Sequence, residues 1–116
     1  MVKVMLVEDD ATMLSLLETL LQIEGFEVAK INDFGNLIPE IREANPKVIL
    51  MDVHLEDIDG KEVLVQLRKD AHFEQTKIIM SSGMDYKDEC LAKGANAFIL
   101  KPYMPDELIN KIKEFG

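Results

Sequence analysis

The chain has 116 residues, enough for one domain that buries roughly two-thirds of its unfolded surface and too few for two. Its 13 Lys and Arg stand against 22 Asp and Glu, and the formal net charge of -9 disfavours nonspecific contact with nucleic acid or anionic lipid. The single cysteine excludes an intrachain disulfide, and neither a membrane-length apolar run nor a signal-peptide pattern is present. We therefore expect one cytoplasmic domain over residues 1–116, with Cys90 as a small buried thiol.

Short Val, Ile and Leu runs alternate with longer amphipathic stretches, and this alternation predicts five βα units. In chain order we expect a strand at Val4–Val7, a helix at Ala11–Glu24, a strand at Phe26–Ile31, a helix at Asn36–Ala44, a strand at Val48–Met51, a helix at Gly60–Lys69, a strand at Lys77–Ser81, a helix at Asp85–Lys93, a strand at Ala97–Leu100 and a helix at Pro105–Phe115. Gly25 and Gly94 should end the first and fourth helices, whereas Pro39 argues against a regular second helix.

The predicted strands are apolar on both faces, so helices must cover both faces of the sheet. Right-handed crossovers then place the sheet between two helical layers. We therefore expect an α/β fold of the flavodoxin-like (βα)5 type, a three-layer sandwich around a five-stranded parallel sheet in the order 2-1-3-4-5.

Polar residues follow four of the predicted strands: Asp9, Asp52, Ser82 and Lys101. In an open parallel sheet, ligands bind outside the carboxyl ends of the strands. Carboxylates hold a divalent cation, while an ammonium and a hydroxyl contact a phosphoryl group. This edge of the sheet is therefore the predicted functional site.

Three adjacent acids, Glu8, Asp9 and Asp10, follow the first strand, and Asp52 should lie near them. Two unit charges about 4 Å apart repel by roughly 4 kcal/mol at an effective dielectric constant of about 20, and a bound cation removes this repulsion. Hard oxygen ligands in an open site favour Mg²⁺, with Mn²⁺ as the alternative. For Asp10 the favoured role is instead the N-cap of the first helix.

Several short segments together resemble the receiver domains of two-component response regulators, and the resemblance covers the whole chain. Their order and spacing across the βα units carry the resemblance, since each segment alone is common. The segments are Val7-Glu8-Asp9-Asp10, Leu50-Met51-Asp52, Ile58-Asp59-Gly60, Ile79-Met80-Ser81-Ser82-Gly83, Gly94-Ala95 and Phe98-Ile99-Leu100-Lys101-Pro102.

The resemblance implies that Asp52 accepts a phosphoryl group from the phosphohistidine of a histidine kinase or phosphotransfer protein. It implies that Asp9 binds Mg²⁺ directly together with Asp52, that Glu8 acts through a water, and that the backbone carbonyl of His54 is a further ligand. Lys101 matches the lysine that contacts the phosphoryl oxygens.

The resemblance also implies an output step. Ser82, rather than Ser81, matches the family's hydroxyl because Gly83 then fills the small-residue position after it. Phe98 matches the switch aromatic that turns into the space vacated by this hydroxyl, although an ordinary core phenylalanine is an equally good interpretation. Pro102 is expected to follow a cis peptide bond.

Some residues depart from the family pattern. Glu56 stands where proline is usual, which predicts a looser loop after Asp52. His54 and Met84 occupy positions that influence hydrolysis of the acyl phosphate, and we expect His54 to face solvent. The short stretch over residues 82–101 predicts a trimmed fourth helix.

The leading hypothesis is a stand-alone switch, not an enzyme beyond its own phosphorylation and dephosphorylation, that binds a downstream protein and neither nucleic acid nor a membrane. One alternative is a receiver fragment of a longer DNA-binding response regulator. Another is a Mg²⁺-dependent phosphohydrolase with Asp52 as nucleophile, although Asp52-Val53-His54 offers no second acid for leaving-group chemistry.

Overall fold

Strands and helices alternate along the chain as the sequence pattern predicts. The computed structural model describes residues 2–115. In chain order its elements are β1 (Lys3–Val7), α1 (Ala11–Ile23), β2 (Glu27–Lys30), η1 (Phe34–Asn36), α2 (Leu37–Ala44), β3 (Val48–Asp52), β4 (His54–Leu55), β5 (Ile58–Asp59), α3 (Gly60–Arg68), η2 (Ala71–Phe73), β6 (Lys77–Ser82), α4 (Lys87–Ala92), β7 (Ala97–Leu100) and α5 (Pro105–Phe115). All ten expected elements are present, within a few residues of their expected ends.

The central sheet has five parallel strands in the order β2-β1-β3-β6-β7. Because β4 and β5 pair only with each other, this order is the predicted 2-1-3-4-5. Successive residues of a strand point to opposite faces, and both faces of the sheet are apolar. Met5 and Ile49 belong to one core cluster, while Val4 and Val48 belong to the other.

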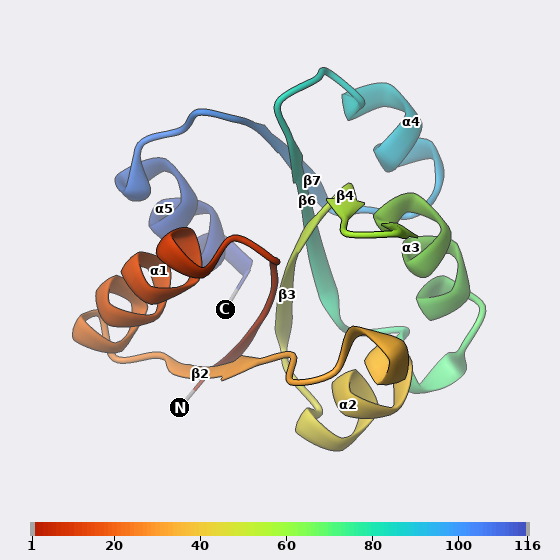
Figure 1. Cartoon of the computed structure of the whole chain (residues 1–116), viewed down its shortest axis with the longest axis horizontal. Coiled ribbons are helices and arrows are strands. Elements are labelled where there is room, and N and C mark those ends of the chain that lie inside the picture. Colours follow the sequence, from red (N-terminus) through yellow and green to blue (C-terminus); the bar gives the residue numbers. More distant parts are fainter. Residues whose placement is uncertain (1, 116) are drawn as a thin grey trace.

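Helices cover both faces of this sheet. Figure 1 shows α1 and α5 on one side and α2, α3 and α4 on the other. Each helical layer buries one of the two core clusters, so neither sheet face meets solvent. The three-layer, flavodoxin-like architecture is therefore confirmed.

The second and fourth helices show how two specific expectations turned out. The second begins with the 3-10 turn η1, and Pro39 is the third residue of α2. The first N–H groups of a helix have no intrahelical acceptor, so a proline there removes no hydrogen bond and our objection to this helix was wrong. The fourth helix is indeed short, covering only Lys87–Ala92, and Gly94 follows it with φ 112°.

The hairpin of β4 and β5 was not predicted. His54 pairs with Asp59 and Leu55 with Ile58 in antiparallel register, so the loop after Asp52 contains a short hairpin with Glu56 in its turn. The looser loop expected at Glu56 stays a prediction. Gly60 closes the hairpin by donating its N–H to the Val53 carbonyl at 2.7 Å. A Cβ on Gly60 would lie 2.2 Å from the carbonyl oxygen of Asp52, so only glycine fits there.

Candidate acidic metal site

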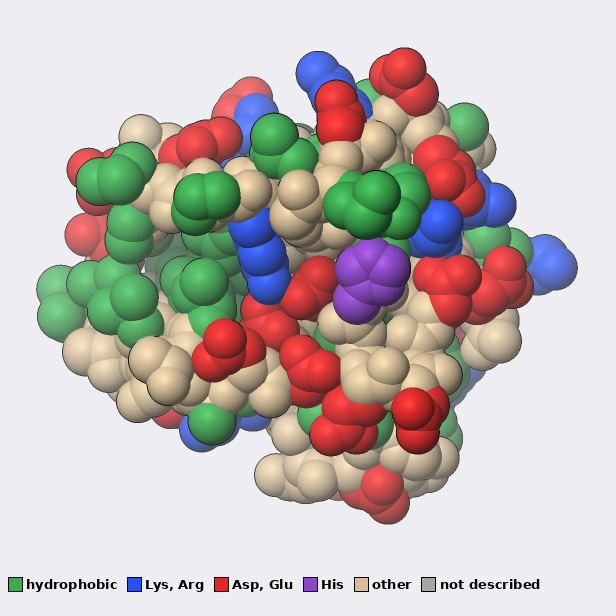
Figure 2. Space-filling model, turned by 45° about the horizontal axis from the view of Figure 1, so that its top comes forward, with side chains coloured by type: hydrophobic (Ala, Val, Ile, Leu, Met, Phe, Trp, Pro, Cys, Tyr) green, Lys and Arg blue, Asp and Glu red, His purple; other side chains and the backbone are tan. Residues whose placement is uncertain are grey.

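The strands deliver the predicted residues to one edge of the sheet. Val7 and Met51 are register partners, so Glu8 and Asp9 leave β1 beside Asp52, the last residue of β3. Lys101 follows β7 directly, and its backbone N–H donates to the Ser82 carbonyl at 2.8 Å. In Figure 2, acidic side chains gather around a basic one in the middle of this face.

Three carboxylates form the centre of the site. Glu8, Asp9 and Asp52 each offer an oxygen, and these oxygens lie within 4.8 Å of one another. Glu8 and Asp52 are only 6% and 9% exposed, whereas Asp9 is open to solvent. This set of hard oxygen donors with one open side fits a divalent cation.

Lys101 is the counter-charge to these acids. Its Nζ donates to Glu8 Oε1 at 2.8 Å and to Asp52 Oδ2 at 2.7 Å. Burial alone would lower the pKa of Lys101, but the hydrogen bonds to Asp52 and Glu8 outweigh it and hold this pKa above its ordinary value. The ammonium therefore remains charged at neutral pH.

The pKa of Glu8 is raised, whereas the pKa of a carboxyl group in a simple ion pair is lowered. Burial of the carboxyl group raises its pKa, and the nearby charge of Asp52 raises it further, against the lowering effect of Lys101. The carboxylate is nevertheless well held, because Glu8 Oε2 accepts the backbone N–H groups of Asp9 at 2.9 Å and Asp10 at 3.3 Å.

Backbone groups of the β4–β5 hairpin also reach the acids. The N–H of Glu56 donates to Asp9 Oδ2 at 2.8 Å, and that of His54 makes a longer contact of 3.4 Å to Asp52 Oδ1. Both bonds join the carboxylates to the loop that follows β3. The sequence did not indicate either of them.

Asp10 lies outside the carboxylate cluster and has the role expected for it. Its Oδ1 accepts the backbone N–H groups of Thr12 at 3.0 Å and Met13 at 3.1 Å, which makes it the N-cap of α1. Of the three adjacent acids, two therefore face the site and one starts the helix.

Ser82 ends β6 beside Lys101, but its hydroxyl is engaged elsewhere. Its side chain is buried, and its Oγ accepts the backbone N–H of Met84 at 3.1 Å. Within residues 2–115, no hydrogen bond joins this hydroxyl to Asp52 or Lys101. Phe98 is half-buried on β7 and packs against the core cluster on the α2, α3 and α4 side of the sheet. The switch roles of Ser82 and Phe98 remain predictions.

The residues around Lys101 are also as expected. The Lys101–Pro102 peptide bond is cis, as the resemblance implied. Tyr103, one residue further on, is partly covered by the core cluster that contains α1 and α5, and this burial raises its pKa to about 12.

His54 is exposed, as expected, but it also contacts Tyr86, the N-cap residue of α4, which was not predicted. The two rings meet edge to face with 5.9 Å between centroids, and Lys61 Nζ lies 4.4 Å from the centre of the Tyr86 ring. Lys61 also pairs with Glu89 at 3.2 Å. These contacts connect the β4–β5 hairpin with α3 and α4. The sequence did not indicate them, because the contacting residues are distant along the chain.

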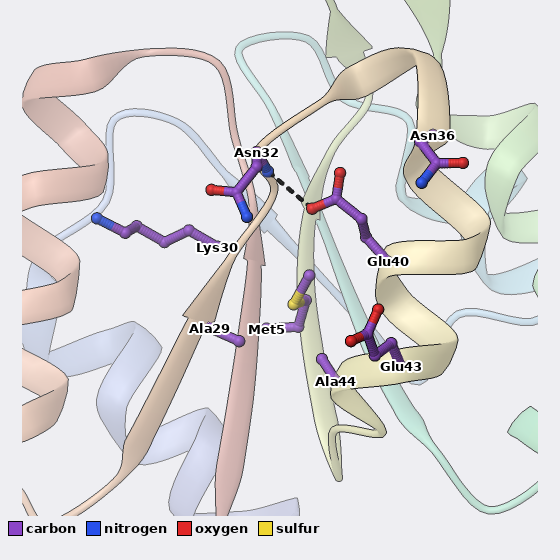
Figure 3. A pocket seen from close by; sticks show the side chains of 8 residues that line it. All are labelled: Met5, Ala29, Lys30, Asn32, Asn36, Glu40, Glu43 and Ala44. Carbon is purple, nitrogen blue, oxygen red and sulfur yellow. Dashed lines mark hydrogen bonds between the residues drawn. The ribbon is translucent and has the colours of Figure 1, made fainter.

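A separate hollow of about 440 Å³ lies between β1, β2 and α2. Figure 3 shows its floor of Met5, Ala29 and Ala44 and its polar rim, where Glu40 Oε1 accepts the backbone N–H of Asn32 at 2.8 Å. Its lining includes none of the clustered acids. This hollow is therefore distinct from the acidic site.

The parallel sheet and the acids at its carboxyl edge define a doubly wound α/β protein with a cluster of carboxylates that could hold a cation. Residues 4–113 match the family model described as the response regulator receiver domain. The chain belongs to this family.

Individual relatives agree with that assignment. Over 113 residues the chain is 30% identical to the DNA-binding response regulator MtrA of Mycobacterium tuberculosis, covering 96% of this chain and 49% of MtrA. Over 112 residues it is 34% identical to the regulatory protein VanRc of Enterococcus gallinarum, covering 96% and 48%. The chain thus spans about half the length of these relatives.

A solved structure matches the entire fold. The chemotaxis response regulator CheY4 of Vibrio cholerae superposes with a TM-score of 0.90 at 26% identity, covering 100% of this chain and 99% of that one. Within residues 2–115, no helix combines the length and apolar character that a membrane crossing requires.

Proposed function

We propose that this receiver domain is a signalling switch in which Asp52 accepts a phosphoryl group from the phosphohistidine of a histidine kinase or phosphotransfer protein. The contact of Lys101 Nζ with Asp52 Oδ2 at 2.7 Å, beside two further carboxylates, carries this proposal. It places a lysine ammonium and a set of metal-binding oxygens around a single nearly buried carboxylate.

In the proposed transfer, a carboxylate oxygen of Asp52 forms a bond to phosphorus. The phosphorus–nitrogen bond of the phosphohistidine breaks, and its electron pair stays on the imidazole nitrogen. The product is an aspartyl phosphate. Lys101 donates to the phosphoryl oxygens, so a fixed positive charge offsets the approach of one anion to another.

We assign a Mg²⁺ ion, with Mn²⁺ as the alternative, to Glu8, Asp9, Asp52 and the backbone carbonyl of His54. Asp9 and Asp52 would bind the ion directly, and Glu8 would act through a water. When bound, the ion supplies positive charge to the phosphoryl oxygens. The clustered carboxylate oxygens support this assignment, because hard oxygen donors prefer such cations.

We propose that the output is a change in binding to a downstream protein. The hydroxyl of Ser82 would give up its hydrogen bond with the Met84 N–H and bond to the new phosphoryl oxygens. Phe98 would then turn toward the space that the hydroxyl vacates. The chain would then be no enzyme beyond its own phosphorylation and dephosphorylation. Its net charge of -9 supports a protein partner over direct contact with nucleic acid.

We also propose that residues 1–116 form one receiver domain, and the family match over residues 4–113 supports this. The free thiol of Cys90 suits the reducing cytoplasm, where we propose that the domain acts.

Intact-mass measurement after incubation with acetyl phosphate and Mg²⁺ tests the proposed acceptor. We expect one phosphoryl group on the wild type, none on Asp52→Asn, and one on the control Asp88→Asn, which neutralises an exposed acid of α4. A phosphoryl group that persists on Asp52→Asn would show that another residue accepts it.

The phosphohydrolase alternative is distinguished by turnover. The residue two positions after Asp52 is His54, so no acid is available there for leaving-group chemistry. The His54 ring is exposed and contacts Tyr86. We therefore expect no more than a slow release of phosphate from added phosphomonoesters, whereas repeated turnover would favour the hydrolase.

A further inference from the structure

Asp9 is the most exposed of the three clustered acids, and it is held differently from the other two. Lys101 bonds to Glu8 and Asp52. Within residues 2–115, the hydrogen bond that the Asp9 carboxylate receives comes from the backbone N–H of Glu56, at 2.8 Å across 47 residues of sequence. Oδ2 of Asp9 therefore has a hydrogen-bond donor, whereas within residues 2–115 its Oδ1 has none.

The direction of the Glu56 N–H depends on an unusual backbone conformation. Glu56 has φ 49°, in the left-handed region that few residues other than glycine, asparagine and aspartate adopt. It lies in the turn between β4 and β5, which is closed by the Leu55–Ile58 pair. The hairpin is itself anchored to the end of β3 by the bond from Gly60 N–H to the Val53 carbonyl.

We propose that the backbone N–H of Glu56 is a positioning group for the metal site, which holds Asp9 so that its second oxygen faces the ion. This inference rests on the proposed function of the acidic site. Without such a bond, an exposed aspartate samples several rotamers. Metal binding then costs the side-chain entropy that is lost when the carboxylate is ordered. Hydrogen bonds that orient a ligating carboxylate commonly change metal affinity by about 10- to 100-fold.

The amino acid at position 56 matters here through its backbone. A proline has no N–H and fixes φ near -65°, so it can neither donate to Asp9 nor adopt the observed turn. A glycine keeps the N–H and adopts φ 49° without strain. A glutamine keeps the N–H and removes only the side-chain charge. The three substitutions thus separate the backbone bond from the side chain of Glu56.

The first experiment measures the Mg²⁺ dissociation constant of the wild type, Glu56→Gly, Glu56→Gln and Glu56→Pro by isothermal titration calorimetry. Thermal melting in EDTA verifies that each variant is folded. We expect Glu56→Gly and Glu56→Gln to bind within about threefold of the wild type, and Glu56→Pro to bind at least about tenfold more weakly. Equal Mg²⁺ affinity of folded Glu56→Pro and Glu56→Gly would overturn the inference.

A second measurement does not depend on the folding of Glu56→Pro. In ¹⁵N-labelled protein without metal, we expect the Glu56 amide to exchange slowly with solvent, and Asp9→Ala to speed that exchange at least about tenfold as the bond is lost. Added Mg²⁺ should shift the same amide resonance in the wild type. Equal exchange rates in the wild type and Asp9→Ala would overturn the inference.

Failure of the Glu56 role and failure of the proposed function give different results. A wild type that binds Mg²⁺ and is phosphorylated on Asp52, with the same affinity in Glu56→Pro, overturns the role of Glu56 alone. A wild type that neither binds Mg²⁺ nor is phosphorylated overturns the proposed function, and the positioning role with it.

Discussion

Lys101 Nζ lies 2.7 Å from Asp52 Oδ2, although 49 residues separate the two along the chain. The same ammonium contacts Glu8, so one lysine neutralises part of a cluster of three carboxylates. Removal of that charge should leave the acids facing one another with no cation between them. The stability of the fold and the affinity of the site for a cation should then change in opposite directions.

We therefore expect Lys101→Met to lower the free energy of unfolding in EDTA by about 2 kcal/mol, since it leaves two nearly buried carboxylates without their donor. Mg²⁺ should bind the variant about tenfold more tightly than the wild type, because a competing positive charge is gone. Urea denaturation and calorimetric titration measure the two effects. Lys87→Met removes the same charge from an exposed position and should change neither; a weaker Mg²⁺ affinity of Lys101→Met would contradict the prediction.

The raised pKa of Glu8 predicts a pH dependence of stability. Because folding raises this pKa above 4.5, Glu8 contributes stability that is fully present below pH 4.5 and is lost as pH rises through the folded-state value. Each tenfold change in the acid dissociation constant corresponds to about 1.4 kcal/mol. In EDTA, Glu8→Gln should therefore gain stability relative to the wild type as pH rises above 4.5.

Chemical denaturation at several pH values measures this difference. Glu74→Gln, which removes the same charge from an exposed position, is the control. A Glu8→Gln variant that loses stability relative to the wild type as pH rises would show that the pairing with Lys101 dominates over burial.

The proposed output step predicts a selective effect of Ser82→Ala. The variant should still be phosphorylated on Asp52, but the shift of the Phe98 ring resonances on phosphorylation should shrink. The loss of one hydrogen bond to a charged group weakens the active state by about 1.5–3 kcal/mol. Ser81→Ala, which removes a hydroxyl one residue earlier, is the matched control. Equal Phe98 shifts in the wild type and Ser82→Ala would disprove the coupling.

Gly60→Ala tests the packing beneath the acidic site. At the first residue of α3, alanine would ordinarily favour the helix, but its Cβ would lie 2.2 Å from the Asp52 carbonyl oxygen. We expect a loss of about 2 kcal/mol or more in the free energy of unfolding, measured in urea. Gly83→Ala is the control, because a Cβ there meets nothing within 4 Å. A Gly60→Ala variant as stable as the wild type would contradict the close approach.

The fold was largely predictable because its signals are local. Apolar runs such as Val48–Met51 are buried on both faces in any parallel sheet, and the ends of such strands meet at one edge. This is why Asp9, Asp52 and Lys101 could be assigned to one site before their contacts were known. The role of Asp10 could be distinguished from those of Glu8 and Asp9, because the helical pattern that follows a residue identifies it as an N-cap.

Other features could not be read in this way. Three contacts depend on the paths of the loops. They are the ring contact of His54 with Tyr86, the bond from the Glu56 N–H to Asp9, and the bond from the Met84 N–H to the Ser82 hydroxyl. The hairpin after Asp52 also had no signal in the sequence, since its pairs depend on the turn at Glu56.

The order of residues determined which segments are strands and helices, and which polar side chains stand at the strand ends, because periodicity and burial are properties of neighbours along the chain. Only the tertiary structure decided which atoms touch across that edge. Contacts between Lys101 and Glu8, 93 residues apart, or between Glu56 and Asp9, require particular backbone angles and loop paths, and these are fixed when the whole chain packs.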